Sequence, residues 1–230
     1  MNFNSIRVAY EFSLEGIEHS RAGNATRSLH LFDEAIALNP GTAAARICRG
    51  LRLLAEGFAG EALRDFDDAI ALGRGAFFLS RAYRCRGLLY HSVKAYDEAD
   101  KDFTTALKYD PDFAEAYYLR GLVNYDLNDF RASVADMSQA LSLAPDSAHA
   151  LMNRGNAFSE LGMYENALKD LTAALSIDPE TAVILYNRGN VLCQLRRLDE
   201  AVQDYTASIE IDNTQSSAYF NRRMGLILII

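Results

Sequence analysis

The chain has 230 residues, of which 50% are apolar and 23% are charged, proportions typical of a folded globular protein. Its net charge of −8, without any basic run, disfavours nucleic acid and anionic membrane surfaces as partners. No apolar run approaches the roughly 18 residues needed to span a bilayer, and the N-terminal region lacks the apolar stretch of a signal peptide. We therefore expect a cytoplasmic protein that binds no nucleic acid and no membrane.

The cysteines and histidines form no metal-binding pattern. Cys48, Cys85 and Cys193 are far apart, contain no C-x-x-C pair and lack histidines at metal-ligand spacing. The sequence therefore predicts neither a metal site nor a cofactor. The scarcity of proline, the lack of tryptophan and the abundance of alanine and leucine favour helical structure.

The sequence is organised by a repeat of 34 residues. Glycine stands at the eighth position of six successive segments, and alanine and proline recur with the same spacing. In chain order the segments are 9–42, 43–76, 80–113, 114–147, 148–181 and 182–215, followed by a half segment at 216–230. Three extra residues, 77–79, separate the second segment from the third.

Each segment is predicted to form two helices joined by a turn. In 148–181, apolar residues recur at helical spacing over 151–161 and again over 167–177. Asp178-Pro179 ends the second helix, because proline disfavours the α conformation in the residue before it. A single hairpin cannot bury its apolar face alone. We therefore expect the hairpins to stack into one solenoid domain over 1–230.

The last segment supplies a first helix without a second. It ends in the apolar run Met224–Ile230, and Arg223 stands where the repeat has glycine. A solenoid normally ends in a polar capping helix. This end therefore indicates a missing remainder, a partner, or self-association through an exposed apolar patch.

A charged pair recurs with the repeat. In the second to the sixth repeat, an arginine stands directly before the glycine, and an aspartate follows 16 residues after that arginine. The first repeat has neither residue. The pairs are Arg49–Asp65, Arg86–Asp102, Arg120–Asp136, Arg154–Asp170 and Arg188–Asp204. Because the two features occur together, we predict a ladder of ion pairs between helices. The alternative is a basic stripe for an anionic ligand, which pairing would neutralise.

The order of glycine, aromatic, alanine and proline positions within each segment resembles the tetratricopeptide repeat (TPR), over 9–215 and part of the rest. The resemblance implies an all-α fold, a right-handed superhelix of six full helix-turn-helix repeats plus a C-terminal half repeat. It also implies a concave groove lined by the first helices. The function it implies is a non-catalytic protein–protein interaction scaffold that binds an extended peptide or a partner helix.

The groove lining expected from this resemblance becomes rich in asparagine in the later repeats. Positions two, five, six, nine, twelve and thirteen share one helical face, and Asn153, Asn187 and Asn221 recur there. An asparagine carries a donor and an acceptor, so it can bind an extended backbone of any sequence. The alternative is that these side chains bond to adjacent helices or to water. The candidate site residues are Arg84, Tyr118, Met152, Asn153, Asn156, Tyr186, Asn187, Asn190, Gln194, Phe220 and Asn221.

Other functions are weighed against the scaffold. The chain could be the recognition arm of a larger enzyme or assembly whose catalytic part is absent. Catalysis by the chain itself is disfavoured, because it has no glycine-rich phosphate loop and no Ser-His-Asp or Cys-His set. The clamp by which some TPR proteins hold chaperone tails is matched only at Asn156 and Asn187. Its basic positions are taken by Met152, Ser217 and Asn221, so chaperone-tail binding is not expected.

Overall fold

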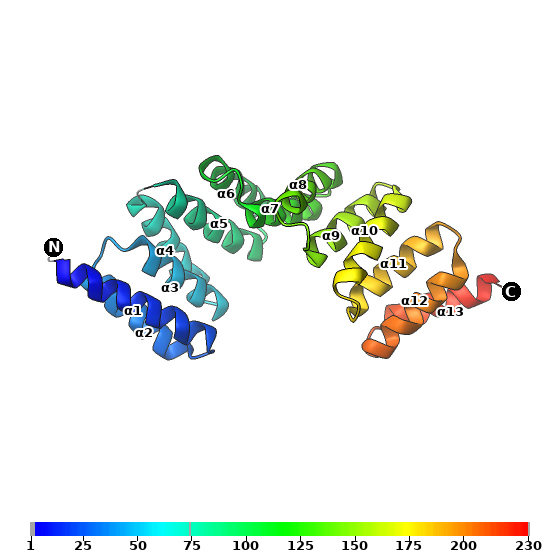
Figure 1. Cartoon of the computed structure of the whole chain (residues 1–230), viewed down its shortest axis with the longest axis horizontal. Coiled ribbons are helices and arrows are strands. Elements are labelled where there is room, and N and C mark those ends of the chain that lie inside the picture. The colour runs from blue at the N-terminus through cyan, green and yellow to red at the C-terminus, as the bar shows by residue number, and fades with distance from the viewer. Residues whose placement is uncertain (1–2, 74, 230) are drawn as a thin grey trace. The chain divides into compact units, whose positions relative to one another are not determined.

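The computed structural model describes residues 3–73 and 75–229, and within them the chain forms thirteen α-helices and no strand (Figure 1). In order they are α1 (Phe3–Arg21), α2 (Ala25–Leu38), α3 (Ala43–Ala55), α4 (Ala59–Leu72), α5 (Ala76–Ser92), α6 (Tyr96–Tyr109), α7 (Ala114–Asp126), α8 (Phe130–Leu143), α9 (Ala148–Glu160), α10 (Tyr164–Ile177), α11 (Ala182–Gln194), α12 (Leu198–Ile211) and α13 (Ser216–Ile229). The predicted all-α solenoid of hairpin repeats is confirmed.

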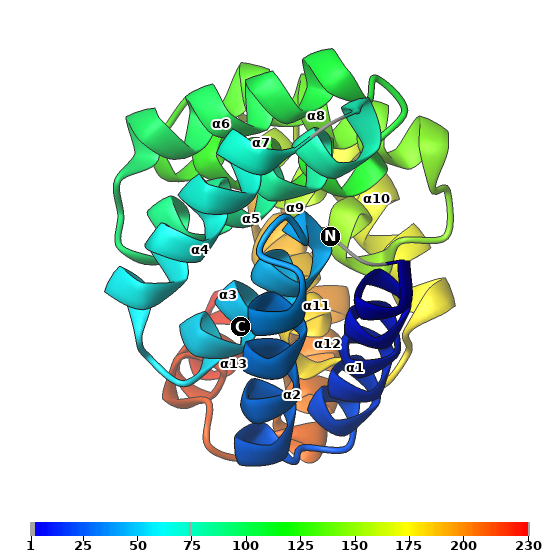
Figure 2. The same ribbon diagram turned by 90° about the vertical axis from the view of Figure 1, so that its left-hand side faces the viewer.

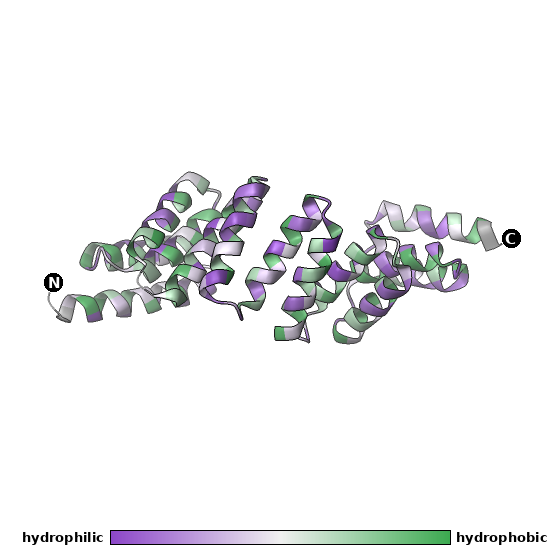
Figure 3. Ribbon diagram, turned by 90° about the horizontal axis from the view of Figure 1, so that it is seen from above, coloured by the Kyte–Doolittle hydropathy of each residue, from purple (hydrophilic) through white to green (hydrophobic). Residues whose placement is uncertain are grey.

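The helices belong to two compact units, Met1–Ala116 and Tyr117–Ile230. In the first unit α1 packs on α2, α3 on α4 and α5 on α6, and Figure 2 shows α1 and α2 side by side. In the second unit the hairpins α9–α10 and α11–α12 are followed by α13, which packs on α12. Figure 3 shows that apolar and polar residues are interspersed along the helices. This pattern is expected of helices that bury one face against neighbours.

The repeat glycine is explained by a buried side chain on the second helix. Position 24 of each repeat carries a large residue that is at most 1% exposed: Phe32, Phe66, Phe103, Met137, Leu171 and Tyr205. A Cβ atom at Gly50 would lie 2.6 Å from the ring of Phe66, and one at Gly189 would lie 2.7 Å from the ring of Tyr205. Glycine therefore lets the two helices of a repeat approach as closely as the buried side chain requires.

The turn inside each hairpin needs a left-handed residue at position 15. Glycine meets this need at three repeats, with φ between 72° and 87°. Lys94, Asn128 and Arg196 adopt φ near 61° at the equivalent positions. A side chain in this conformation is strained. Backbone hydrogen bonds across the turn, such as that from Ala95 N to Tyr90 O at 2.9 Å, hold it there. The repeat alignment did not single out this position, because four different residue types occupy it.

The predicted ladder of Arg–Asp ion pairs is confirmed for all five pairs. In each, Nε and Nη2 of the arginine on the first helix donate to the two carboxylate oxygens of the aspartate on the second. The donor–acceptor distances lie between 2.6 and 2.9 Å. The aspartates are buried and the arginines are about one-fifth exposed. Such forked pairs fix the orientation of one helix on the other.

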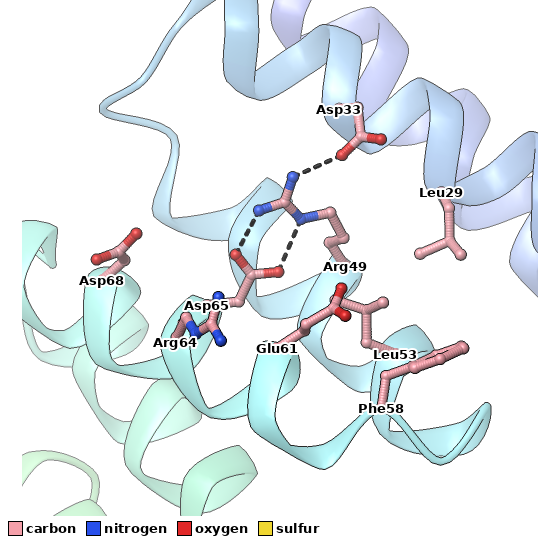
Figure 4. A pocket seen from close by; sticks show the side chains of 9 residues that line it. All are labelled: Leu29, Asp33, Arg49, Leu53, Phe58, Glu61, Arg64, Asp65 and Asp68. Atoms are coloured by element: carbon pink, nitrogen blue, oxygen red, sulfur yellow. Dashed lines mark hydrogen bonds and ion pairs between the residues drawn. The ribbon is translucent and has the colours of Figure 1, made fainter.

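Several of these arginines also reach the second helix of the preceding repeat. Arg49 of α3 binds Asp65 of α4 and, through Nη1, Asp33 of α2 at 2.5 Å (Figure 4). Arg86 binds Asp67 in the same way at 2.6 Å, and Arg154 donates to the Ser138 hydroxyl at 3.1 Å. The hydrogen bonds with Asp65 raise the pKa of Arg49 above its already high value. Each of these arginines therefore joins three helices and locks the register between repeats.

Removing one Arg–Asp ion pair should destabilise the second unit. In Asp170→Ala the largely buried Arg154 loses the carboxylate to which it is bonded, and we expect the free energy of unfolding to fall by about 3 kcal/mol. The double variant Arg154→Met/Asp170→Leu should recover most of this loss, because no buried charge is left unpaired. Urea unfolding followed by circular dichroism measures both. Glu200→Ala removes the exposed pair with Arg197 and serves as the control that leaves the midpoint unchanged.

Candidate functional site

The candidate residues of the second unit gather on the first helices of successive repeats. Five asparagines, Asn153 and Asn156 on α9, Asn187 and Asn190 on α11, and Asn221 on α13, are all partly buried. We call these five residues the amide row. Contacts between α9 and α11 and between α11 and α13 bring its members together.

The three asparagines at position six of their repeats donate hydrogen bonds to the first helix of the preceding repeat. Asn153 Nδ2 donates to the Tyr118 hydroxyl at 3.1 Å. Asn187 Nδ2 donates to Asn156 Oδ1 at 3.0 Å. Asn221 Nδ2 donates to Asn190 Oδ1 at 2.9 Å and to the Tyr186 hydroxyl at 3.3 Å. The alternative interpretation of the asparagines, as bonds between adjacent helices, therefore accounts for part of their hydrogen-bonding capacity.

Part of the hydrogen-bonding capacity of the amide row is not used within the described protein. Each asparagine has one carbonyl oxygen and two N–H donors. Among the described residues, the carbonyl oxygens of Asn153, Asn187 and Asn221 accept no protein hydrogen bond, and the Nδ2 groups of Asn156 and Asn190 donate none. Donors and acceptors therefore alternate along the row, as they do along a peptide backbone.

Tyr205 connects the amide row to the core. Its ring is 1% exposed, and its hydroxyl donates to Asn190 Oδ1 at 2.9 Å and lies 3.4 Å from Cys193 Sγ. Burial is the main cause that raises the pKa of Tyr205. Tyr205 was not among the sequence candidates. The signal that could have found it is a hydroxyl at a position that is Phe, Met or Leu in the other repeats.

A small hollow lies beside the middle of the amide row. Its volume is about 150 Å³. It is lined by Tyr125, Asn156, Ser159, Glu160, Asn187, Asn190 and Val191. Tyr125 and Glu160 line this hollow together. Burial chiefly, then the charges of Glu160 and Asp126, raise the pKa of Tyr125. Glu160 and Tyr125 were not among the sequence candidates, although both occupy positions on the expected groove face.

The remaining candidates lie outside this hollow. Met152 borders a second hollow of about 180 Å³ with His149 and Val183. Gln194 and Phe220 are exposed, the latter 65%. Arg84 belongs to the first unit, where it forms an ion pair with Glu115 at 2.8 Å. Most of the candidates thus lie in the second unit, whereas Arg84 lies in the first.

The described residues contain neither a cluster suited to a metal ion nor a helix that could span a membrane. Over 3–73 and 75–229, no three His, Cys, Asp or Glu side chains gather in a way that could hold a metal ion. None of the helices described there is long and apolar enough to cross a membrane.

Family models match most of the chain. Models described as tetratricopeptide repeat match residues 14–77, 114–147, 148–181 and 182–215, and one described as TPR repeat matches 87–128. No curated protein matches the chain in sequence.

Solved structures resemble the chain in fold. PilF of Pseudomonas aeruginosa is 15% identical with a TM-score of 0.85, covering 96% of this chain and 99% of that one. A chain of the APC/C hetero-tetramer Cut9-Hcn1 is 17% identical with a TM-score of 0.81; the match covers 95% of this chain but only 42% of that one. YrrB, described as a TPR protein with an unusual peptide-binding site, is 24% identical with a TM-score of 0.69, covering 84% and 97%.

The role of the Tyr205 hydroxyl can be tested by its removal. In Tyr205→Phe the ring should still fit, because Phe fills this position in three other repeats. The lost hydrogen bond to Asn190 should lower the free energy of unfolding by about 1 kcal/mol. Thermal unfolding measures the change, with Tyr219→Phe at an exposed position as the control. Equal stability of Tyr205→Phe and the wild type would show that the hydroxyl does not anchor the row.

Proposed function

Because this chain belongs to the tetratricopeptide repeat family, we propose that it is a non-catalytic interaction scaffold whose amide row binds an extended peptide of a partner protein. The observation that carries this proposal is the set of amide groups in the row that make no hydrogen bond within the described protein. A partly buried polar group gains from a partner, and an extended peptide supplies N–H and C=O groups in alternation.

The spacing of the row suits an extended chain. Packed helices lie roughly 8–10 Å apart, and an extended chain advances about 3.3 Å per residue. Successive first helices would therefore meet the peptide backbone roughly once every three residues. The hydrogen bonds between Asn187 and Asn156 and between Asn221 and Asn190 hold the side chains in place beforehand. Preorganisation of this kind lowers the entropic cost of binding.

The alternative function uses the same surface. As the recognition arm of a larger enzyme or assembly, the chain would bind its peptide while another polypeptide performs the chemistry. The Cut9-Hcn1 structure is a hetero-tetramer, and the present chain spans 42% of the chain it matches there. Both functions predict peptide binding by the amide row. They differ in whether the chain works together with a catalytic polypeptide.

The amide row can be tested with a displayed library of random ten-residue peptides selected on the full chain. We expect selected peptides to bind the triple variant Asn153→Ala/Asn187→Ala/Asn221→Ala at least tenfold more weakly, because each substitution removes a carbonyl acceptor. Fluorescence anisotropy gives the dissociation constants. The control is Asn166→Ala/Asn213→Ala, which removes two exposed amides outside the row.

The triple variant also loses hydrogen bonds between helices, so its helicity and unfolding midpoint are measured alongside. If the triple variant unfolds, the single variant Asn153→Ala takes its place, because it loses only the hydrogen bond to Tyr118. We expect its affinity for the selected peptides to be about threefold lower. Selected peptides that bind the folded variants as tightly as the wild type would overturn the proposal.

A second candidate is self-association through α13. Phe220, Met224, Leu226 and Ile227 are between 40% and 65% exposed on this helix. Side chains of this kind gathered on one helix indicate an interaction surface. The side chains of 228–230, which complete the apolar run noted in the sequence, lie outside the described residues.

Light scattering coupled to size-exclusion chromatography tests this second candidate. We expect the wild type to show twice the 25.5 kDa mass of one chain, and Leu226→Glu/Ile227→Glu to show the mass of one chain, because a buried charge opposes the contact. Leu127→Glu, at an exposed apolar residue of a hairpin turn, is the control. A single-chain mass for the wild type at the highest concentration would contradict self-association.

A further inference from the structure

From the hollow beside the amide row, we propose that the bound peptide carries a lysine or arginine whose side chain is held by Glu160. The inference rests on the proposed function and adds a charge requirement to it. It follows from the charges on this face, from their place on the helices and from the contacts of Glu160.

The face that bears the amide row has carboxylates and no strong cation. At the groove positions of the repeats over 117–215, the only formally charged residues are Asp126 and Glu160, and lysine and arginine are absent. The arginines of the same helices stand at position seven, where Arg120, Arg154 and Arg188 are joined to aspartates of the second helices. A peptide side chain of positive charge would therefore meet no like charge on this face.

Both carboxylates stand at the C-terminal end of a helix, where the helix dipole disfavours a negative charge. Asp126 is the last residue of α7 and Glu160 is the last residue of α9. The C-terminal end of a helix carries partial negative charge, so an acidic side chain there opposes the helix dipole and a cation is favoured. The position of Glu160 thus has no explanation in the stability of α9. It does strengthen the negative potential over the hollow.

Glu160 is not neutralised within the unit. It lines the hollow together with Tyr125, and among the described residues no lysine, arginine or histidine forms an ion pair with it. Its carboxylate oxygens can therefore accept a hydrogen bond from a ligand. Tyr125 also brings an aromatic ring to the same hollow, and a cation beside such a ring gains further stabilisation.

The amide row fixes the peptide backbone next to this carboxylate. Asn156 and Asn187 line the hollow together with Glu160, and their mutual hydrogen bond leaves the Asn156 amide and the Asn187 carbonyl for the ligand. A backbone bound there would direct a neighbouring side chain into the hollow. Backbone recognition by the amides would then set the affinity for any extended chain, and Glu160 would select those with a basic residue.

The same random ten-residue library tests the inference. We expect peptides selected on the wild-type full chain to share a lysine or arginine in one register. Glu160→Gln should weaken a selected peptide about tenfold, the loss expected for one charge-assisted hydrogen bond. Glu160→Lys should reject that peptide and instead bind its Lys→Glu counterpart. Glu210→Gln, an equal charge change at an exposed residue of α12, should leave binding unchanged.

Salt and variant data separate the two hypotheses. In the wild type, affinity should fall as NaCl rises, and Glu160→Gln should remove most of this dependence. Peptides that depend on the asparagines but show no basic preference, or bind Glu160→Gln as tightly, would overturn the role of Glu160 and leave the proposed function standing. Peptides that bind independently of the asparagines would overturn the proposed function itself.

Discussion

The close approach of the two helices in each repeat is the constraint on which the rest of the structure depends. Glycine at position eight of the first helix leaves room for one large buried side chain at position 24 of the second. With the helices at this distance, the arginine before the glycine reaches the aspartate before the buried residue, and a forked ion pair forms. A larger residue in place of the glycine would push the two helices apart and disrupt both the packing and the ion pair, because the interior has no spare volume for it.

In the proposed function, one side chain of the amide row serves both structure and recognition. Asn187 uses an N–H to hold α11 against α9, and its carbonyl oxygen accepts no hydrogen bond from the described residues. Asn190 is the reverse case, since its carbonyl accepts from both Tyr205 and Asn221 while its amide is left over. The hydrogen bonds within the row fix the positions of the remaining groups, which is the condition for binding a backbone without a large entropic cost.

Charge is divided between two faces of the hairpins. The arginines are joined to carboxylates between the helices, so they present no basic stripe, and Arg49 and Arg86 each meet a second carboxylate. The face of the amide row keeps its carboxylates at helix ends, where the dipole adds to their effect. The two arrangements differ in kind: the arginines are compensated within the protein, whereas we propose that Glu160 is compensated by a basic residue of the bound peptide.

The sequence by itself determined the number of helices, their faces and the Arg–Asp ladder. All three follow from the 34-residue period, because a pattern that recurs in successive repeats predicts the same local structure in each. It also placed the asparagines on one face, because helical periodicity assigns residues to faces. Only the tertiary structure decided which atoms meet across neighbouring helices, as Asn153 meets Tyr118 and Tyr205 meets Asn190. These partners come from different helices, and whether a hydroxyl reaches an amide depends on how the helices stack. Sequence periodicity does not specify that distance.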